Sequence, residues 1–482
     1  MSLAINRIDR ISEFFNENKN SHWFYYGLVI INTWIAFFLR FYRLEKWGLS
    51  FDEAFTYFNA IKIINNFSVD FNSALVEHPI TSFLIYVFTN LVGHSEWAIR
   101  FIPALAGTIT ITLLYTPLKK IFNEPIALLV MFLMAISPWH IFWSQNARFY
   151  VLLLLFCSYA LLAFHFGLET GHRRWFITAF LFFGAALSER LLAILLFPVF
   201  LFIFLFSYFL PYKPKGLRFS NLMILLLPLL VISVIFGWQY IQNPLLWVDL
   251  FFQWLGNSPW EIARSFVYHV DVYKVGMGIL GGVYVLRNRN FQGVVFIISA
   301  ALIPIMVIVG ASFQFVHVRY MFISLVSWYV LAAVTAVTLY ESTINNIKWL
   351  MVAVLLLLLV IEPLQDNFDY FSSVNGDRNN WRAAFQYIQP SLQEKDVIIS
   401  SVPEVGEYYL NRDVLSMENS DQKIDPLDLT ESKERAWFII GGKAREDASL
   451  RMWIESQGEQ VYYDNQNIKV WLYIPGDIDF SG

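Results

Sequence analysis

Residues Leu191–Leu210 read LLAILLFPVFLFIFLFSYFL and contain no charged side chain. At about 20 residues, such a run is long enough to cross a bilayer as a helix. The rest of the chain has the same character: of its 482 residues, 57% are hydrophobic and 15% are charged, and the mean hydropathy is +0.50. This composition excludes a soluble globular protein and predicts an α-helical polytopic membrane protein.

Comparable apolar runs recur along the chain, and together they predict about eleven membrane spans, several of them short enough to need tilting or bending. They are Phe24–Phe41, Phe101–Leu118, Pro125–Trp143, Tyr150–Gly167, Trp175–Leu187, Leu191–Leu210, Leu222–Trp238, Val272–Leu286, Phe291–Val309, Tyr320–Tyr340 and Trp349–Leu364. The polar N-terminus has no small-residue cleavage site after its first apolar run, so we expect that run to be retained as a span. The segment Pro79–Gly93 is shorter and interrupted by Thr and Ser, which favours a juxtamembrane or re-entrant helix.

Basic loops set the expected orientation. With Pro79–Gly93 outside the count, one face of the membrane receives five basic segments, and the positive-inside rule makes that face cytoplasmic. They are Lys119-Lys120, His172–Arg174, Lys213–Arg218, Arg287–Arg289 and Lys348. If Pro79–Gly93 crossed fully, these loops would face outward. The other face receives the loop 43–100 and everything after Leu364.

The chain changes character after the last apolar run. We expect residues 1–365 to form the transmembrane domain, with 43–100 as its outer catalytic loop, and 366–482 to form a small extracytoplasmic α/β domain. Its expected strands are Val397–Ile399, Ala436–Ile440, Val461–Tyr463 and Ile468–Ile474, and its expected helices are Trp381–Ile388 and Ala448–Ile454.

An acidic pair, Asp52 and Glu53, follows the first apolar run in the segment WGLSFDEAFTY, Trp47–Tyr57. Carboxylates are costly near hydrocarbon, so a pair at the mouth of a membrane bundle indicates a functional site. The alternative is a helix N-terminus, where acidic side chains are favoured in the first turn. The pair by itself does not separate these two interpretations.

Arginines gather on the same outer face as the acidic pair. Arg100, Arg148, Arg190 and Arg319 are candidates for binding a lipid phosphate, because a guanidinium donates to phosphate in a bidentate fork. Each could instead extend from a helix end to the lipid headgroups. His78 and His317 could donate hydrogen bonds or bind a metal, although their spacing does not indicate a ligand set. Tyr57 is a candidate for stacking on a sugar.

Other features narrow the class of partner. The net charge of −4 and the lack of a Lys/Arg-rich tract give no reason to expect nucleic acid. The single cysteine, Cys157, excludes an internal disulfide. Composition indicates membrane lipids as partners. The carboxylates and arginines of the outer face suit transfer of a group from a lipid phosphate to an acceptor, which the sequence does not identify.

Four blocks of sequence together resemble the C-type glycosyltransferase superfamily, in particular relatives of the protein O-mannosyltransferases and aminoarabinose transferases (family 39). They are Ser50–Tyr57, Glu77–Ile80, Gly93–Gly107 and Ser137–Tyr150, with weaker matches at His317–Tyr320 and Asn380–Ala384. The resemblance implies a polyprenyl-phosphate sugar as donor and action at the outer face. It also implies that Asp52 is the catalytic base, Glu53 its acidic neighbour and Arg100 an arginine of the site, and Glu77 and His78 fall in a block of the same pattern.

Two departures from the family pattern limit what carries over. The second block reads His-Pro-Ile where a double proline is commoner, and Asn146 stands where relatives often have an acid, so a second carboxylate and a divalent metal held by it are in doubt. The hypothesis is an inverting membrane glycosyltransferase, with its site outside the plasma membrane of a prokaryote. The alternative is a transporter or flippase for lipid-linked sugars; charges clustered at one face favour the enzyme.

Overall fold

The structure of the protein is a computed structural model. It describes residues 22–66, 78–209, 213–242, 256–287, 291–373, 376, 378–417, 435–441, 448–463 and 468–475. By its internal contacts the chain forms two compact units. The bundle unit comprises Met1–Tyr42, Val69–Leu84 and Phe101–Phe368, and the sheet unit comprises Arg43–Ser68, Ile85–Arg100 and Asp369–Gly482. The expected domain boundary at residue 366 stays a prediction. In the division by internal contacts, most of the loop 43–100 belongs to the same unit as the C-terminal residues.

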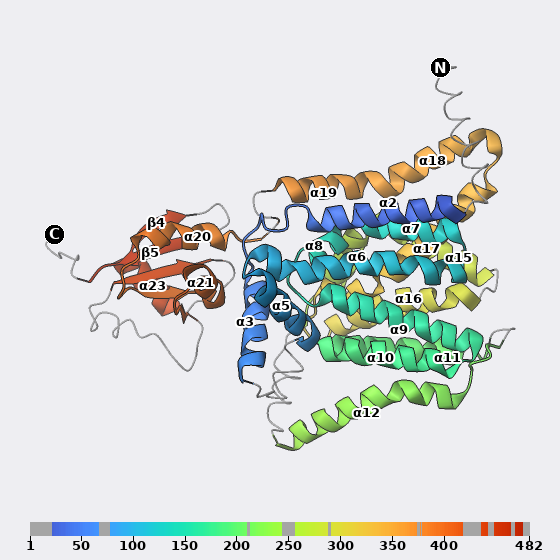
Figure 1. The fold of residues 1–482 in the computed structure, drawn as a ribbon, viewed down its shortest axis with the longest axis horizontal. Coiled ribbons are helices and arrows are strands. Elements are labelled where there is room, and N and C mark those ends of the chain that lie inside the picture. The colour runs from blue at the N-terminus through green and yellow to red at the C-terminus, as the bar shows by residue number, and fades with distance from the viewer. Residues whose placement is uncertain are drawn as a thin grey trace. The chain divides into compact units, whose positions relative to one another are not determined.

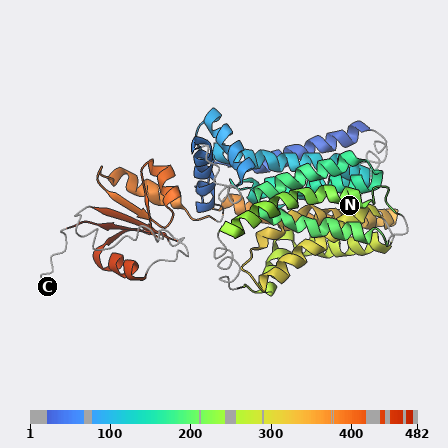
Figure 2. The ribbon, with the colours of Figure 1, turned by 90° about the horizontal axis from the view of Figure 1, so that it is seen from below.

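The bundle unit consists of helices that run alongside one another (Figures 1 and 2). Its α-helices are α2 (His22–Phe41), α7 (Glu124–Ile136), α8 (Pro138–Ser144), α9 (Tyr150–Thr170), α10 (Arg173–Glu189), α11 (Leu196–Phe206), α12 (Phe219–Gln242), α14 (Pro259–Val270), α15 (Val272–Arg287), α16 (Phe291–Ala311), α17 (Leu325–Ser342) and α18 (Lys348–Leu356). Short 3-10 segments η1 (Leu191–Leu195), η2 (Val318–Ser324) and η3 (Asn345–Ile347) and a π-helical turn, η4 (Leu357–Ile361), adjoin them. Helices α5 (Pro79–Val92), α6 (Glu96–Ile121) and α19 (Glu362–Ser372) contribute residues to both units.

Each of the apolar runs expected to cross the membrane coincides with a helix or with consecutive helical segments. Among the described residues, six helices are long and apolar enough to span a bilayer, or seven if α7 and α8 form one bent span. The protein is therefore an integral membrane protein, as its composition predicts. The larger count of about eleven includes shorter helices and stays a prediction.

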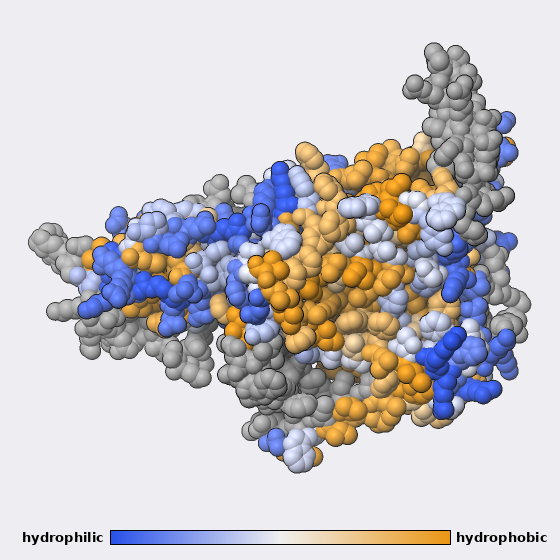
Figure 3. Space-filling view, in the orientation of Figure 1, coloured by the Kyte–Doolittle hydropathy of each residue, from blue (hydrophilic) through white to orange (hydrophobic). Residues whose placement is uncertain are grey.

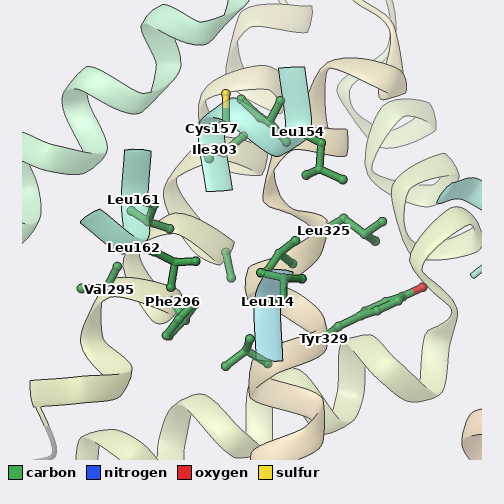
Figure 4. Packing of buried hydrophobic residues seen from close by; sticks show 14 of the residues in the cluster. Leu114, Leu154, Cys157, Leu161, Leu162, Val295, Phe296, Ile303, Leu325 and Tyr329 are labelled. Atoms are coloured by element: carbon green, nitrogen blue, oxygen red, sulfur yellow. The ribbon is translucent and has the colours of Figure 1, made fainter. Parts of the chain in front are cut away.

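The interior of the bundle unit is packed from aliphatic and aromatic side chains of many helices. Figure 4 shows Leu114, Cys157, Phe296 and Tyr329 in this cluster, all of them buried. The outer surface is also apolar, and Figure 3 shows hydrophobic residues over much of the visible face of the bundle helices. A bundle that is apolar both inside and outside is suited to lipid rather than water.

A break of 62° separates α7 from α8, and buried side chains satisfy the carbonyl groups that it frees. The Arg40 guanidinium is wholly buried and donates to the oxygens of Met134 (2.9 Å) and Ala135 (3.0 Å), and the Asn367 amide donates to Ile136 O (2.7 Å). Unsatisfied backbone groups are costly in lipid, so these bonds make the bend tolerable. The bend places α8 and the turn that follows it.

The sheet unit contains a five-stranded sheet in the order β2-β1-β3-β5-β4. Its strands are β1 (Val397–Ser400), β2 (Leu415–Ser416), β3 (Ala436–Ile440), β4 (Glu459–Tyr463) and β5 (Lys469–Tyr473), and its helical segments are α3 (Phe51–Asn66), α20 (Trp381–Ile388), η5 (Gln389–Ser391), α21 (Pro403–Leu410) and α23 (Ala448–Gln457). Strand β1 pairs in parallel with β2 and β3, whereas β5 pairs antiparallel with β3 and β4. The mixed sheet confirms a small α/β fold.

Alternating side chains divide the core of the sheet unit between the two faces of the sheet. Ile398 and Ile439 pack with residues of α20 and α21, whereas Ile399 and Phe438 pack with Ile454 of α23. Successive residues of a strand point to opposite faces, so helices cover the sheet on both sides. Ala54 of α3 belongs to the first of these clusters, which joins the acidic segment to the sheet unit.

Candidate active site

The acidic segment begins helix α3 with a capping box. The Glu53 carboxylate accepts hydrogen bonds from the backbone N–H (3.0 Å) and the hydroxyl (3.1 Å) of Ser50, three residues earlier. In this motif, Ser at the N-cap and Glu at the third helical position satisfy otherwise orphaned groups. Glu53 thus lies in the first turn of a helix, as the helix-terminus interpretation of the acidic pair predicts.

Arg100 binds Glu53 through two parallel hydrogen bonds, from Nε to Oε1 (2.7 Å) and from Nη2 to Oε2 (2.9 Å). Its remaining N–H groups bind backbone oxygens of the segment before α3: Leu44 (3.0 Å), Trp47 (2.7 Å) and Gly48 (2.9 Å). A guanidinium has five N–H donors, and this geometry assigns a protein acceptor to every one. Both side chains are wholly buried. In this arrangement Arg100 holds the acidic segment, and its expected contact with donor phosphate remains a prediction that the geometry does not favour.

Glu53 is ionised because of this arrangement. Burial would raise the pKa of its carboxyl group, but the charges of Arg100 and Arg378 and the hydrogen bonds from Arg100 and Ser50 outweigh burial and lower the pKa to about 2. A carboxylate with four hydrogen bonds and a low pKa is a poor proton acceptor near neutral pH. Glu53 is thus suited to holding structure, not to accepting a proton.

Asp52 differs from its neighbour. Its side chain is half-buried, whereas that of Glu53 is fully buried. The backbone oxygen of Asp52 accepts a bond from the Thr56 hydroxyl (2.9 Å), one turn later in α3. Of the two acids, Asp52 is the one that is not fully buried.

Residues from the C-terminal part of the sheet unit hold the same segment, and the sequence did not single them out as site residues. Arg382 donates to the oxygens of Glu45 (3.0 Å) and Trp47 (2.9 Å), and the Tyr409 hydroxyl accepts from Leu49 N (2.8 Å). The Arg378 guanidinium lies over the Trp47 ring, 5.3 Å from its centroid. Arg382 lies in the weakly matching block Asn380–Ala384, which was the available signal.

In the bundle unit, three of the four predicted phosphate-binding arginines gather around one pair of aromatic rings. Phe149 and Tyr150 follow the turn after α8 and are both buried, with ring centroids 4.2 Å apart. The guanidinium groups of Arg148 and Arg190 lie 5.5 and 5.6 Å from the Phe149 ring, and that of Arg319 lies 5.6 Å from the Tyr150 ring. We call these five residues the arginine cluster. Segments far apart in sequence thus bring three cations together.

His78 completes one side of the arginine cluster. Its ring stacks on Phe149 at 3.8 Å, and its Nδ1 lies 2.7 Å from Glu189 O. The Glu189 carboxylate in turn accepts from Ile80 N (2.7 Å) and from the Thr81 backbone and hydroxyl at the start of α5. Burial, assisted by the charges of Arg148 and Arg190, lowers the pKa of His78 to about 3, although the bond to Glu189 opposes this shift. His78 is therefore a neutral imidazole among cations.

The other predicted site residues have varied positions. Tyr57 is nearly buried, and its hydroxyl lies 2.9 Å from Nδ1 of His94. The rings of Phe315 and Tyr320 contact that of His317. Glu77 lies outside the described residues. Asn146 is buried in the turn before the arginine cluster. Within the described part of the chain, no three His, Cys, Asp or Glu side chains form a group that could hold a metal ion.

Part of the chain matches a known protein family. Residues 77–238 match the family of dolichyl-phosphate-mannose-protein mannosyltransferases. This segment includes His78, Arg100, Arg148 and Arg190. None of the curated proteins matches the chain.

Solved structures extend the resemblance over nearly the whole chain. ArnT from Cupriavidus metallidurans, in its apo state, has a TM-score of 0.67 at 15% identity, covering 92% of this chain and 98% of ArnT; ArnT bound to undecaprenyl phosphate also has a TM-score of 0.67, at 14% identity. The oligosaccharyltransferase AglB from Archaeoglobus fulgidus, in complex with an inhibitory peptide and a dolichol-phosphate, has a TM-score of 0.60 at 14% identity, covering 97% of this chain and 75% of AglB. The resemblance expected from the sequence is confirmed: the chain has the fold of the C-type membrane glycosyltransferases and carries a segment that matches the mannosyltransferase family.

Proposed function

We propose that this protein is an inverting membrane glycosyltransferase, which moves a sugar from a polyprenyl-phosphate donor to a hydroxyl or amine of an acceptor on the extracytoplasmic face of a prokaryotic plasma membrane. The observation that carries the proposal is that the two adjacent acids have different surroundings. Glu53 is buried in a bidentate pair with Arg100, and this pair holds the helix from which the half-buried Asp52 projects.

Asp52 is the base in this mechanism. It removes a proton from the acceptor, whose oxygen or nitrogen attacks the anomeric carbon of the donor sugar from the face opposite the phosphate. The bond between that carbon and the phosphate oxygen breaks, and polyprenyl phosphate leaves with the electron pair. Help of this kind from a positioned base contributes typically 10²–10⁴-fold to a rate.

The arginine cluster is the proposed site for the phosphate. Its three guanidinium groups lie within 5.6 Å of the centroids of two aromatic rings, which concentrates positive charge at one place, and a guanidinium suits phosphate because it stays charged and can donate in a bidentate fork. Fixed cations stabilise the charge that develops on the leaving phosphate. The related structures support this class of donor, because ArnT was solved bound to undecaprenyl phosphate and AglB in complex with a dolichol-phosphate.

A turnover assay tests the proposal. The full chain in lipid nanodiscs is mixed with undecaprenyl phosphates carrying different radiolabelled sugars, and envelope extract from the source cells supplies the acceptor. We expect acceptor-dependent release of undecaprenyl phosphate from at least one donor, and loss of this release in Asp52→Asn. Movement of the intact lipid-linked sugar between leaflets without any release would favour the flippase instead.

A further inference from the structure

A cleft of about 560 Å³ opens within the sheet unit, between α3, the turn before α6, and helices α20 and α21. Every residue that lines it belongs to this one unit. Small-molecule sites typically occupy about 300–1,000 Å³. The cleft is thus large enough for part of a substrate, and nothing in the mechanism above has used it.

Hydrogen bonds fix the aromatic wall of this cleft. The Tyr57 and Tyr408 rings meet edge to face, with centroids 5.5 Å apart. Both are tied to His94: the Tyr57 hydroxyl lies 2.9 Å from its Nδ1, and the Tyr408 hydroxyl donates to its backbone oxygen (3.0 Å). Rings held in this way form a preorganised surface, which lowers the entropy cost of binding.

The polar groups of the cleft favour an uncharged ligand. Its lining includes two carboxylates, Glu96 and Glu407, against one guanidinium, Arg382. Arg382 is paired with Glu96 at 2.8 Å, and the Tyr409 hydroxyl donates to the same carboxylate (3.0 Å). The formal charge of the lining residues is therefore −2 + 1 = −1 with His94 neutral, which disfavours a phosphate or carboxylate group.

Carboxylates, amides and tyrosine hydroxyls are well matched to sugar hydroxyl groups. The cleft offers acceptors on Glu96 and Glu407 and both donors and acceptors on Gln386 and Asn411. Tyrosine provides an apolar ring face together with a polar tip. A neutral, hydroxyl-rich chain matches both kinds of surface, whereas a purely apolar ligand would match only the tyrosine rings.

We propose that this cleft binds an uncharged glycan segment of the acceptor, an inference that rests on the proposed glycosyl transfer. Tyr57 of the cleft and Asp52 belong to the same helix, five residues apart, or about 7.5 Å along the axis. An acceptor held in the cleft is therefore held at a fixed position relative to the proposed base. The donor phosphate, which is anionic, is excluded by the charge of the same lining.

Saturation-transfer NMR on the full chain tests the proposal directly. The protein is placed in lipid nanodiscs, because detergents with sugar headgroups would compete, and no donor is added. The probes are neutral tetrasaccharides of mannose, glucose or N-acetylglucosamine. We expect at least one to bind, and we expect Gln386→Trp, which adds a bulky ring on the exposed α20 side of the cleft, to weaken its binding at least tenfold.

Gln389→Trp is the matched control, since it makes the same change at an exposed residue just beyond α20 that does not line the cleft. Binding in this variant should be unchanged. The proposal is overturned if no tetrasaccharide binds, or if both tryptophan variants bind equally to the unaltered protein. The binding experiment contains no donor, so it is independent of the turnover assay. If undecaprenyl phosphate is released in the turnover assay but no glycan binds, only the proposed glycan site is overturned. If a glycan binds but no undecaprenyl phosphate is released, only the proposed transferase activity is overturned.

Discussion

Arginine has opposite surroundings in the two units. In the sheet unit, Arg100 directs all five N–H groups to Glu53 and to three backbone oxygens. In the bundle unit, the guanidinium groups of Arg148, Arg190 and Arg319 all lie within 5.6 Å of the centroids of one pair of aromatic rings. The same residue type thus acts in one place as a structural tie and in the other as a concentration of positive charge. The comparison predicts that substitutions in the two places fail in different ways.

The largest effect is expected at the structural tie. Arg100→Ala removes both bidentate hydrogen bonds from the buried Glu53 carboxylate and leaves Arg378, 3.7 Å away, as a cationic neighbour. Breaking a buried pair in this way typically costs about 3–5 kcal/mol. Arg100→Lys should not rescue the fold, because an ammonium has three donors where five are used. We expect both variants to give little monodisperse protein after extraction, and a lower thermal midpoint in what remains.

Arg190→Lys is the matched control for that loss of folding. Arg190 is only half-buried, and Lys keeps its charge, so its thermal midpoint should stay close to that of the unaltered protein. If Arg100→Lys were as stable as Arg190→Lys, the distinction between the tie and the arginine cluster would be wrong.

The next largest effect is expected at Asp52. Asp52→Asn removes the proposed base but no hydrogen bond of the Glu53–Arg100 pair, so turnover should fall about 10²-fold or more while the thermal midpoint changes little. Turnover is read as release of undecaprenyl phosphate in the presence of acceptor. Substituting Glu53 instead should mainly lower the thermal midpoint, because Glu53 holds the buried pair. Near-normal turnover of well-folded Asp52→Asn would contradict the proposed mechanism.

Local patterns in the sequence predicted much of the fold. Helix α20 and strand β3 occur at the predicted residues, because the helical spacing of apolar side chains in α20 and the short, wholly apolar run of β3 are visible without knowledge of distant contacts. Helices α14 and α21 were not predicted. Each has a proline in its first turn, and Ser258 caps α14, so the start signals were present but short.

The roles of individual site residues were harder to predict. The sequence placed Arg100 with the other outer-face arginines, and the family resemblance marked it as an arginine of the site, but no local pattern predicts which groups Arg100 and Arg148 bind. What separates them is the set of acceptors around each one, such as Leu44 O and Gly48 O, which are brought to Arg100 only by folding. The gathering of Arg148, Arg190 and Arg319 around one ring pair likewise depends on tertiary packing.

A moderate effect is expected in the arginine cluster itself. An arginine that binds phosphate through two parallel N–H donors loses this bidentate geometry when it is changed to lysine, although the positive charge remains. We therefore expect Arg190→Lys to raise the donor concentration for half-maximal rate about tenfold, equivalent to about 1.4 kcal/mol. Arg319→Lys should act in the same direction, with the acceptor dependence unchanged in both. Normal donor dependence in both variants would assign the phosphate to other groups.

The smallest effect concerns pH and His78, which borders the arginine cluster. Its pKa is lowered from 6.5 to about 3 by burial and by the charges of Arg148 and Arg190, so the unfolded chain binds a proton at this site between those values and the folded chain does not. The stability that His78 contributes is therefore present above pH 6.5 and is lost as the pH falls toward 3, with a slope approaching about 1.4 kcal/mol per pH unit. His78→Asn removes the titrating group and suits the positive φ of 53° at this position. Thermal midpoints of the two proteins, measured between pH 7 and about pH 4.5, should fall more steeply for the unaltered protein. Parallel curves would show that His78 is not held neutral among the arginines.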